Sequence, residues 1–82
     1  MTDTPRAAMT NQDLAARLGI THSAVSRLRS GTRTPSTPTM QAIAREFKWS
    51  IQDQFTVKTN EGAAGFAAEL ENRLRADLDK AA

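Results

Sequence analysis

Polar side chains able to form hydrogen bonds line one side of a short helix that the sequence predicts at residues 22–30. The members of this polar face, spaced i, i+4 and i+7, are Ser23, Arg27 and Ser30. Val25 and Leu28, which are apolar, lie on the opposite side. A guanidinium and hydroxyls recognise a ligand by hydrogen bonding. The chain shows no convincing carboxylate pair, nucleophile–base arrangement or glycine-rich phosphate loop, so we expect no enzymatic activity.

Two short helices joined by a tight turn, predicted at residues 11–18 and 22–30, position this face. The first helix has one packing face at spacings i, i+3, i+4 and i+7, made by Asn11, Leu14, Ala15 and Leu18. Gly19 suits the residue after a helix end, because glycine tolerates positive φ. Thr21 is a good N-cap for the second helix. The small Ala15 allows the two helices to cross closely.

This pattern resembles the helix-turn-helix of the lambda-repressor-like (Cro/repressor, XRE-type) family of DNA-binding proteins. The resemblance covers residues 10–55 and rests on seven positions of the motif: Leu14, Ala15, Leu18, Gly19, Ile20, Val25 and Leu28. It implies an all-α fold, a compact helix-turn-helix bundle of four to five short helices, to which this chain adds a C-terminal amphipathic helix. It also implies that the second motif helix enters the major groove of DNA.

The resemblance implies base contacts from the start and the outward face of that helix, namely from His22, Ser23, Ser26 and Arg27. Arg27 is the strongest candidate, because a guanidinium can bind guanine O6 and N7 with two hydrogen bonds. The alternatives for Arg27 are a phosphate contact and a solvated surface position. His22 contacts a base or a phosphate, or is a solvated residue at the helix start.

Phosphate contacts fix the register of such a protein on DNA and dominate its affinity. The candidates surround the reading helix or begin a neighbouring helix, and they are Thr10, Asn11, Thr21, Arg29, Ser30, Arg33, Thr34 and Thr39. For the threonines among them, plain helix capping is the alternative. Arg17 and Arg45 are assigned to solvated surface.

Composition points to a small binding domain. The chain has 82 residues, no cysteine and one histidine, so we expect no metal site and no cofactor. Its net charge of +2 is uneven: residues 14–48 hold six basic residues and one acidic residue, a net +5, whereas residues 61–82 have a net −2. A basic face suits a polyanion. No apolar run approaches the roughly 20 residues of a membrane span, and we expect a cytoplasmic location.

The elements outside the motif are predicted from caps and apolar spacing. Thr4 and Pro5 favour a short N-terminal helix of one or two turns before the motif, and a further helix runs from Thr37-Pro38 to about Phe47. A short fifth helix follows Ser50, with Ile51 and Phe55 as its apolar side. Lys48 occupies a helix end where the family often has glycine, which implies some backbone strain. The residues assigned to the core by helical spacing include Met9, Met40, Phe47, Trp49 and Phe55.

The C-terminal part is divided from the DNA-binding domain, residues 1–55, by a linker or short strand at 56–62. Residues 63–82 form a helix whose apolar stripe, at steps of four, is Phe66, Leu70, Leu74 and Leu78. Glu69 with Arg73, and Glu71 with Arg75, are expected as i, i+4 pairs. The stripe is the only unclaimed apolar surface, so we expect this helix to pack on the motif core, in its own subunit or across a dimer.

Two functions remain open at this point. The first is a sequence-specific transcriptional regulator of phage or bacterial origin that binds a double-stranded DNA operator and acts by occupying it, as a monomer or homodimer, with no membrane and no small-molecule partner. The chain has no room for a sensor or effector domain, so occupancy itself would be the output. The second is a protein-interaction module, such as an antitoxin, whose C-terminal helix binds a partner protein.

Overall fold

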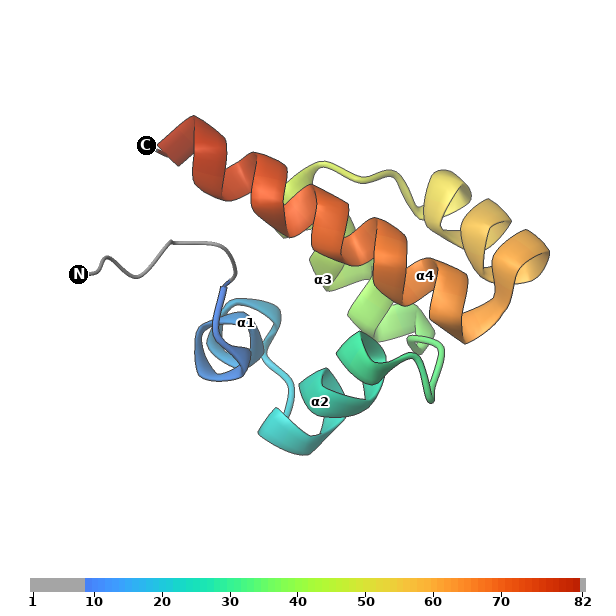
Figure 1. Ribbon diagram of the computed structural model, residues 1–82, viewed down its shortest axis with the longest axis horizontal. Coiled ribbons are helices and arrows are strands. Elements are labelled where there is room, and N and C mark those ends of the chain that lie inside the picture. Colours follow the sequence, from blue (N-terminus) through green and yellow to red (C-terminus); the bar gives the residue numbers. More distant parts are fainter. Residues whose placement is uncertain (1–8, 82) are drawn as a thin grey trace.

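The fold is a bundle of α-helices. The computed structural model describes residues 9–81, with side-chain environments up to residue 76, and this part of the chain contains four helices and no strand. They are α1 (Asn11–Leu18), α2 (His22–Ser30), α3 (Thr37–Phe47) and α4 (Ile51–Ala81) (Figure 1). The predicted all-α fold class is confirmed. The short helix expected before Met9 falls on residues that lie outside the described part.

Local caps set the ends of the two motif helices, which begin and end at the predicted residues. The Asp13 amide donates to Thr10 Oγ1 at 3.0 Å, and the Ala24 amide donates to Thr21 Oγ1 at 3.1 Å. These hydroxyls satisfy amides that have no partner within the first helical turn. Gly19 ends α1 with a φ of 69°, in the left-handed region that favours glycine.

The N-cap of helix α3 lies one residue before Thr37, the cap that the sequence predicts. Ser36 is the N-cap, and Pro38 lies within the first turn. At the other end, Lys48 adopts a φ of 56°. A side chain with a Cβ is strained in this conformation, so the strain expected from the lysine at this position is present.

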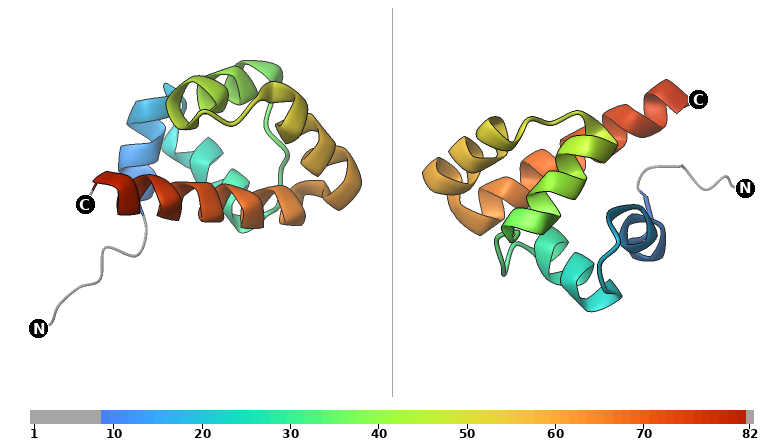
Figure 2. Two further views of the ribbon diagram at one scale, coloured as in Figure 1. Left: turned by 90° about the horizontal axis from the view of Figure 1, so that it is seen from above. Right: turned by 180° about the vertical axis from the view of Figure 1, so that it is seen from behind.

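Helix α4 replaces the linker or short strand predicted at residues 56–62. The residues up to 61 are helical, and only Gly62 departs, with φ 74° and ψ −168°. The chain reverses at Gly62, and the second half of α4 runs back across the bundle (Figures 1 and 2). Residues 55–59 alternate between apolar and polar, which is the pattern of a strand. They are helical nonetheless, because Gln54 and Val57, three residues apart, both face the core.

The inward face of the first half of α4 also differs from the expectation. Ile51 and Phe55 are 40% and 57% exposed, so their assignment to the core side is wrong. The buried residue is Gln54, whose side-chain amide donates to the carbonyl oxygens of Met40 at 2.9 Å and Trp49 at 2.8 Å. These two buried carbonyls need donors, and an amide with two N–H groups satisfies both.

The core joins the motif to the second half of α4. Phe66, Leu70 and Leu74 are buried and belong to one apolar cluster with residues of the motif, including Leu14 and Val25. Helix α4 packs on α2 and α3, and α1 also packs on α2 and α3. The expected apolar stripe is therefore buried inside its own chain at these three positions, and its fourth member, Leu78, lies outside the residues whose side chains are described. Trp49, Met9 and Met40 lie in the interior as predicted, and Phe47 is half-buried.

Candidate nucleic-acid interface

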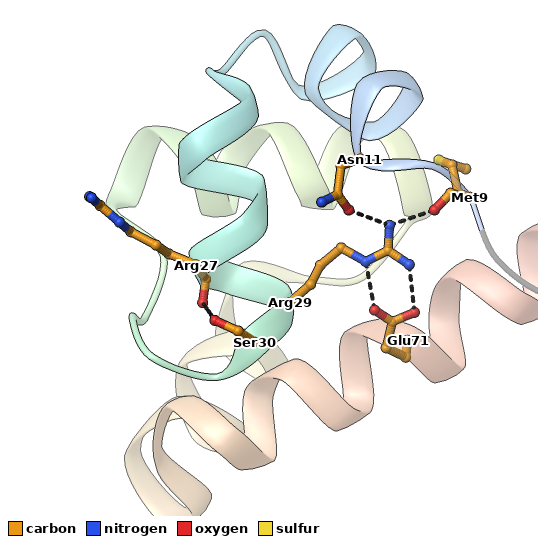
Figure 3. Close-up of polar contacts among 6 residues, drawn as sticks. All are labelled: Met9, Asn11, Arg27, Arg29, Ser30 and Glu71. Atoms are coloured by element: carbon orange, nitrogen blue, oxygen red, sulfur yellow. Dashed lines mark hydrogen bonds and ion pairs between the residues drawn. The ribbon is translucent and has the colours of Figure 1, made fainter.

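The outer face of α2 presents the four residues predicted to contact bases. All four are exposed, and they are His22, Ser23, Ser26 and Arg27. The Arg27 side chain points away from the rest of the molecule (Figure 3). Within the described part of the chain its guanidinium has no hydrogen-bond or ion-pair partner. Its donors are thus free for an external acceptor.

The inner face of α2 holds this helix in place. Val25 is fully buried and Leu28 is 3% exposed, so both are packed against the core. Ala15 of α1 is partly buried against the same core. The polar face is therefore carried by a helix that is anchored on its opposite side.

The loop after α2 adds a second basic position beside the polar face. Arg33 is exposed, and Thr34 is half-buried. Both line an open pocket of about 290 Å³ together with Ala24 and Leu28 of α2. Ser30 is exposed, and its hydroxyl donates to the Arg27 carbonyl at 3.2 Å. The loop therefore lies alongside α2, next to Ala24 and Leu28, and Ser30 is at the end of the helix.

Three of the predicted phosphate contacts are used inside the protein instead. The Arg29 side chain is only 14% exposed, and its guanidinium donates to the Glu71 carboxylate and to the Met9 carbonyl and Asn11 Oδ1. The half-buried Asn11 is therefore a partner of Arg29. Thr39 is buried, and its hydroxyl lies 3.1 Å from that of Ser36. We do not retain Arg29, Asn11 or Thr39 as phosphate contacts. Thr10 and Thr21 are exposed but cap helices.

Glu71 pairs with Arg29 and not with Arg75, the partner that the sequence predicts. Its expected partner, Arg75, donates to Asn72 Oδ1 at 3.2 Å, whereas the other expected pair, Arg73 with Glu69, forms at 3.2 Å. Arg29 and Glu71 are 42 residues apart in the chain. The only sequence signal toward their contact was the opposite net charge of their two segments.

Ion pairs within the protein neutralise part of the positive charge of residues 14–48. Arg17 lies 3.3 Å from a Glu46 carboxylate oxygen and packs over the Phe47 ring. Arg45 is mostly exposed and lies 3.5 Å from the other Glu46 oxygen. Together with the inward-facing Arg29, these contacts leave Arg27 and Arg33 as the guanidinium groups beside the polar face.

Neither a metal centre nor a membrane span is present in the part of the chain that the structure describes. Among those residues, no three histidine, cysteine or acidic side chains gather as metal ligands would. None of the described helices is long and apolar enough to cross a bilayer.

A protein-family model described as Helix-turn-helix, of the lambda-repressor-like type, matches residues 6–54. The chain belongs to this family. The match includes both motif helices of the lambda-repressor-like domain and all of α3, and it ends at the start of α4. This helix-turn-helix protein is thus a DNA-binding regulator in general terms. Among curated proteins and solved structures, none is significantly similar to it.

Proposed function

We propose that the protein is a sequence-specific transcriptional regulator of the Cro/repressor type, which occupies a double-stranded DNA operator through α2. The observation that carries this proposal is the exposed polar face of α2 on a helix whose other side is locked into the core. A reading helix needs both properties, because its side chains must reach base edges while its axis stays fixed.

In this proposal α2 lies in the major groove of the operator. The unpaired Arg27 guanidinium donates two hydrogen bonds to guanine O6 and N7. Ser23 and Ser26 are short, so they read bases at close range or through water. His22, at the start of α2, contacts a base or a phosphate.

Phosphate contacts on both sides of α2 set the register. Ser30 is the last residue of α2, and Thr34 and the exposed Arg33 follow it in the next loop. In this proposal the three contact the phosphates of one strand. The amide ends of α1 and α2, capped by Thr10 and Thr21, attract phosphate through the helix dipole. An operator bound in this way and overlapping a promoter excludes RNA polymerase sterically, in the cytoplasm of a bacterial or phage-infected cell.

The alternative of an antitoxin-like module required the C-terminal helix to offer its apolar stripe to a partner protein. Phe66, Leu70 and Leu74 are each 1% exposed or less within their own chain. That surface is consequently not available without unfolding the core, which favours DNA as the partner.

Two measurements test the proposal. Selection of bound sites from a random DNA pool should return a defined sequence, and symmetric half-sites would indicate that a homodimer binds. Titration of the selected site at several salt concentrations should give a slope of about −0.9 in log K against log salt for each neutralised phosphate. A flat salt response, or no enrichment of any sequence, would exclude operator binding.

Substitution separates the base contact from the phosphate contact. Arg27→Ala should weaken binding to the selected site by about 1–3 kcal/mol and relax preference at one base pair. Arg33→Ala should weaken binding to selected and scrambled duplexes alike, because a phosphate contact carries no sequence information. An equal loss on both duplexes for Arg27→Ala would contradict its assignment.

A further inference from the structure

The C-terminal end of α2 is held at two points along α4. Gly31, which ends α2, approaches α4 so closely that a Cβ built on it would lie 3.1 Å from the Ala64 Cα. Seven residues further along α4, Glu71 accepts hydrogen bonds from Arg29 with both carboxylate oxygens, at 2.7 and 3.0 Å. Residues seven apart share a helical face. One face of α4 therefore makes both contacts with the end of α2.

The same guanidinium also reaches α1. Arg29 Nη1 donates to the Met9 carbonyl and to Asn11 Oδ1, which lies at the first residue of α1 (Figure 3). All three guanidinium nitrogens are used in this way. One side chain thus joins the start of α1, the end of α2 and the middle of the second half of α4.

Arg27 and Arg29 lie two residues apart, within one turn of α2, and their side chains leave opposite sides of the helix (Figure 3). Arg27 points outward and is free within the described residues, whereas Arg29 points toward Glu71. A guanidinium and a carboxylate joined by two parallel hydrogen bonds have a fixed planar geometry. Because Arg29 is only 14% exposed, solvent and salt screen this pair less than a surface ion pair.

We propose that Glu71 is a positioning residue for DNA recognition, acting through Arg29 to fix the reading helix α2 relative to α1 and α4. The inference rests on the proposed function and extends it, because it gives the C-terminal helix a role in sequence discrimination. Base contacts from α2 and phosphate contacts at the start of α1 must form together on one duplex. Recognition sites need placement to within about 0.5 Å. Glu71 holds the Arg29 guanidinium, and this guanidinium in turn bonds the start of α1, so the network fixes α2 relative to α1.

The test compares Glu71→Gln with the matched control Glu69→Gln. Each change removes one negative charge from α4 and one ion pair, but among the described residues Glu69 pairs only with Arg73, on its own helix, at 3.2 Å. Binding to the selected site and to a scrambled duplex is measured by fluorescence anisotropy, at a temperature where circular dichroism shows each variant folded. Both variants should bind scrambled DNA equally. Glu71→Gln alone should lose about 2- to 30-fold in affinity for the selected site.

Arg29→Lys provides a second variant, since lysine keeps the charge but cannot form the planar pair. It should reduce the ratio of specific to scrambled binding as Glu71→Gln does, and the double variant should show little further loss, because both changes break one network.

Tighter binding of Glu71→Gln to both duplexes, with a salt slope steeper by about 0.9, would show that freed Arg29 binds phosphate and would overturn the inference. Identical behaviour of Glu71→Gln and Glu69→Gln would also overturn it. If the wild type fails to discriminate, the proposed function itself is refuted.

Discussion

Two phenylalanines of α4, both assigned to packing surfaces by the sequence, have opposite environments. Phe66 is 1% exposed and stacks on Trp49, with ring centroids 4.9 Å apart and an interplanar angle of 20°. Phe55 is 57% exposed. Phe66→Ala should therefore destabilise the protein far more than the chemically identical change Phe55→Ala.

The size of the difference follows from burial. Truncation of a buried phenylalanine to alanine costs about 3–5 kcal/mol, including the cavity that it leaves, whereas a change at an exposed position costs about 0.5 kcal/mol. A domain of this size has a total free energy of unfolding of about 4–12 kcal/mol. Since 1 kcal/mol shifts Tm by about 4–8 °C in small domains, Phe66→Ala should lower Tm by roughly 12–40 °C and Phe55→Ala by a few degrees.

Thermal melting followed by circular dichroism, at two protein concentrations tenfold apart, measures both variants. Because Phe66 is buried within its own chain, the wild-type Tm should not depend on protein concentration. Equal shifts for the two variants would refute the packing described here. A wild-type Tm that rises with concentration, and no longer does so in Phe66→Ala, would instead show that the stripe is buried across a dimer.

Two further changes test the junction between α3 and α4. Gln54→Glu should reduce the free energy of unfolding by about 3–5 kcal/mol in urea titrations at neutral pH. The change buries a charge and removes the donors to the Met40 and Trp49 carbonyls. Unchanged stability would contradict these buried hydrogen bonds. Lys48→Gly should increase that free energy by about 0.5–1 kcal/mol, because glycine adopts a φ of 56° without strain, and a lower urea midpoint would disprove this account.

The parts of the fold that depend on neighbouring residues were predictable from the sequence. Thr10 and Thr21 cap α1 and α2 through amides three residues away, and Gly19 and Gly31 end these helices with positive φ. These signals act within one helical turn, so the pattern of residue types contains them. The outward position of Arg27 followed from the same helical spacing.

The parts that depend on distant residues were not predictable. Ile51 and Phe55 have the spacing of an apolar helix face. Gln54 faces inward instead, because its side-chain amide supplies the hydrogen-bond donors that two buried carbonyls require. Glu71 had an equally suitable local partner in Arg75, and only the return of the chain after Gly62 brings it to Arg29. The spacing of residues along one helix does not predict which of two such partners forms the ion pair, because the packing of the helices decides which partner is within reach.

The position of Glu71 so late in the chain has a consequence for synthesis. Arg29 leaves the ribosome 42 residues ahead of Glu71, which corresponds to roughly 2–8 s at about 5–20 residues per second. During that interval the apolar side of α2 lacks the cover that Phe66, Leu70 and Leu74 later supply. The nascent helix-turn-helix therefore passes through a period of exposure to proteases and chaperones. Helix α2 reaches its final position only when the segment around Glu71 has been made.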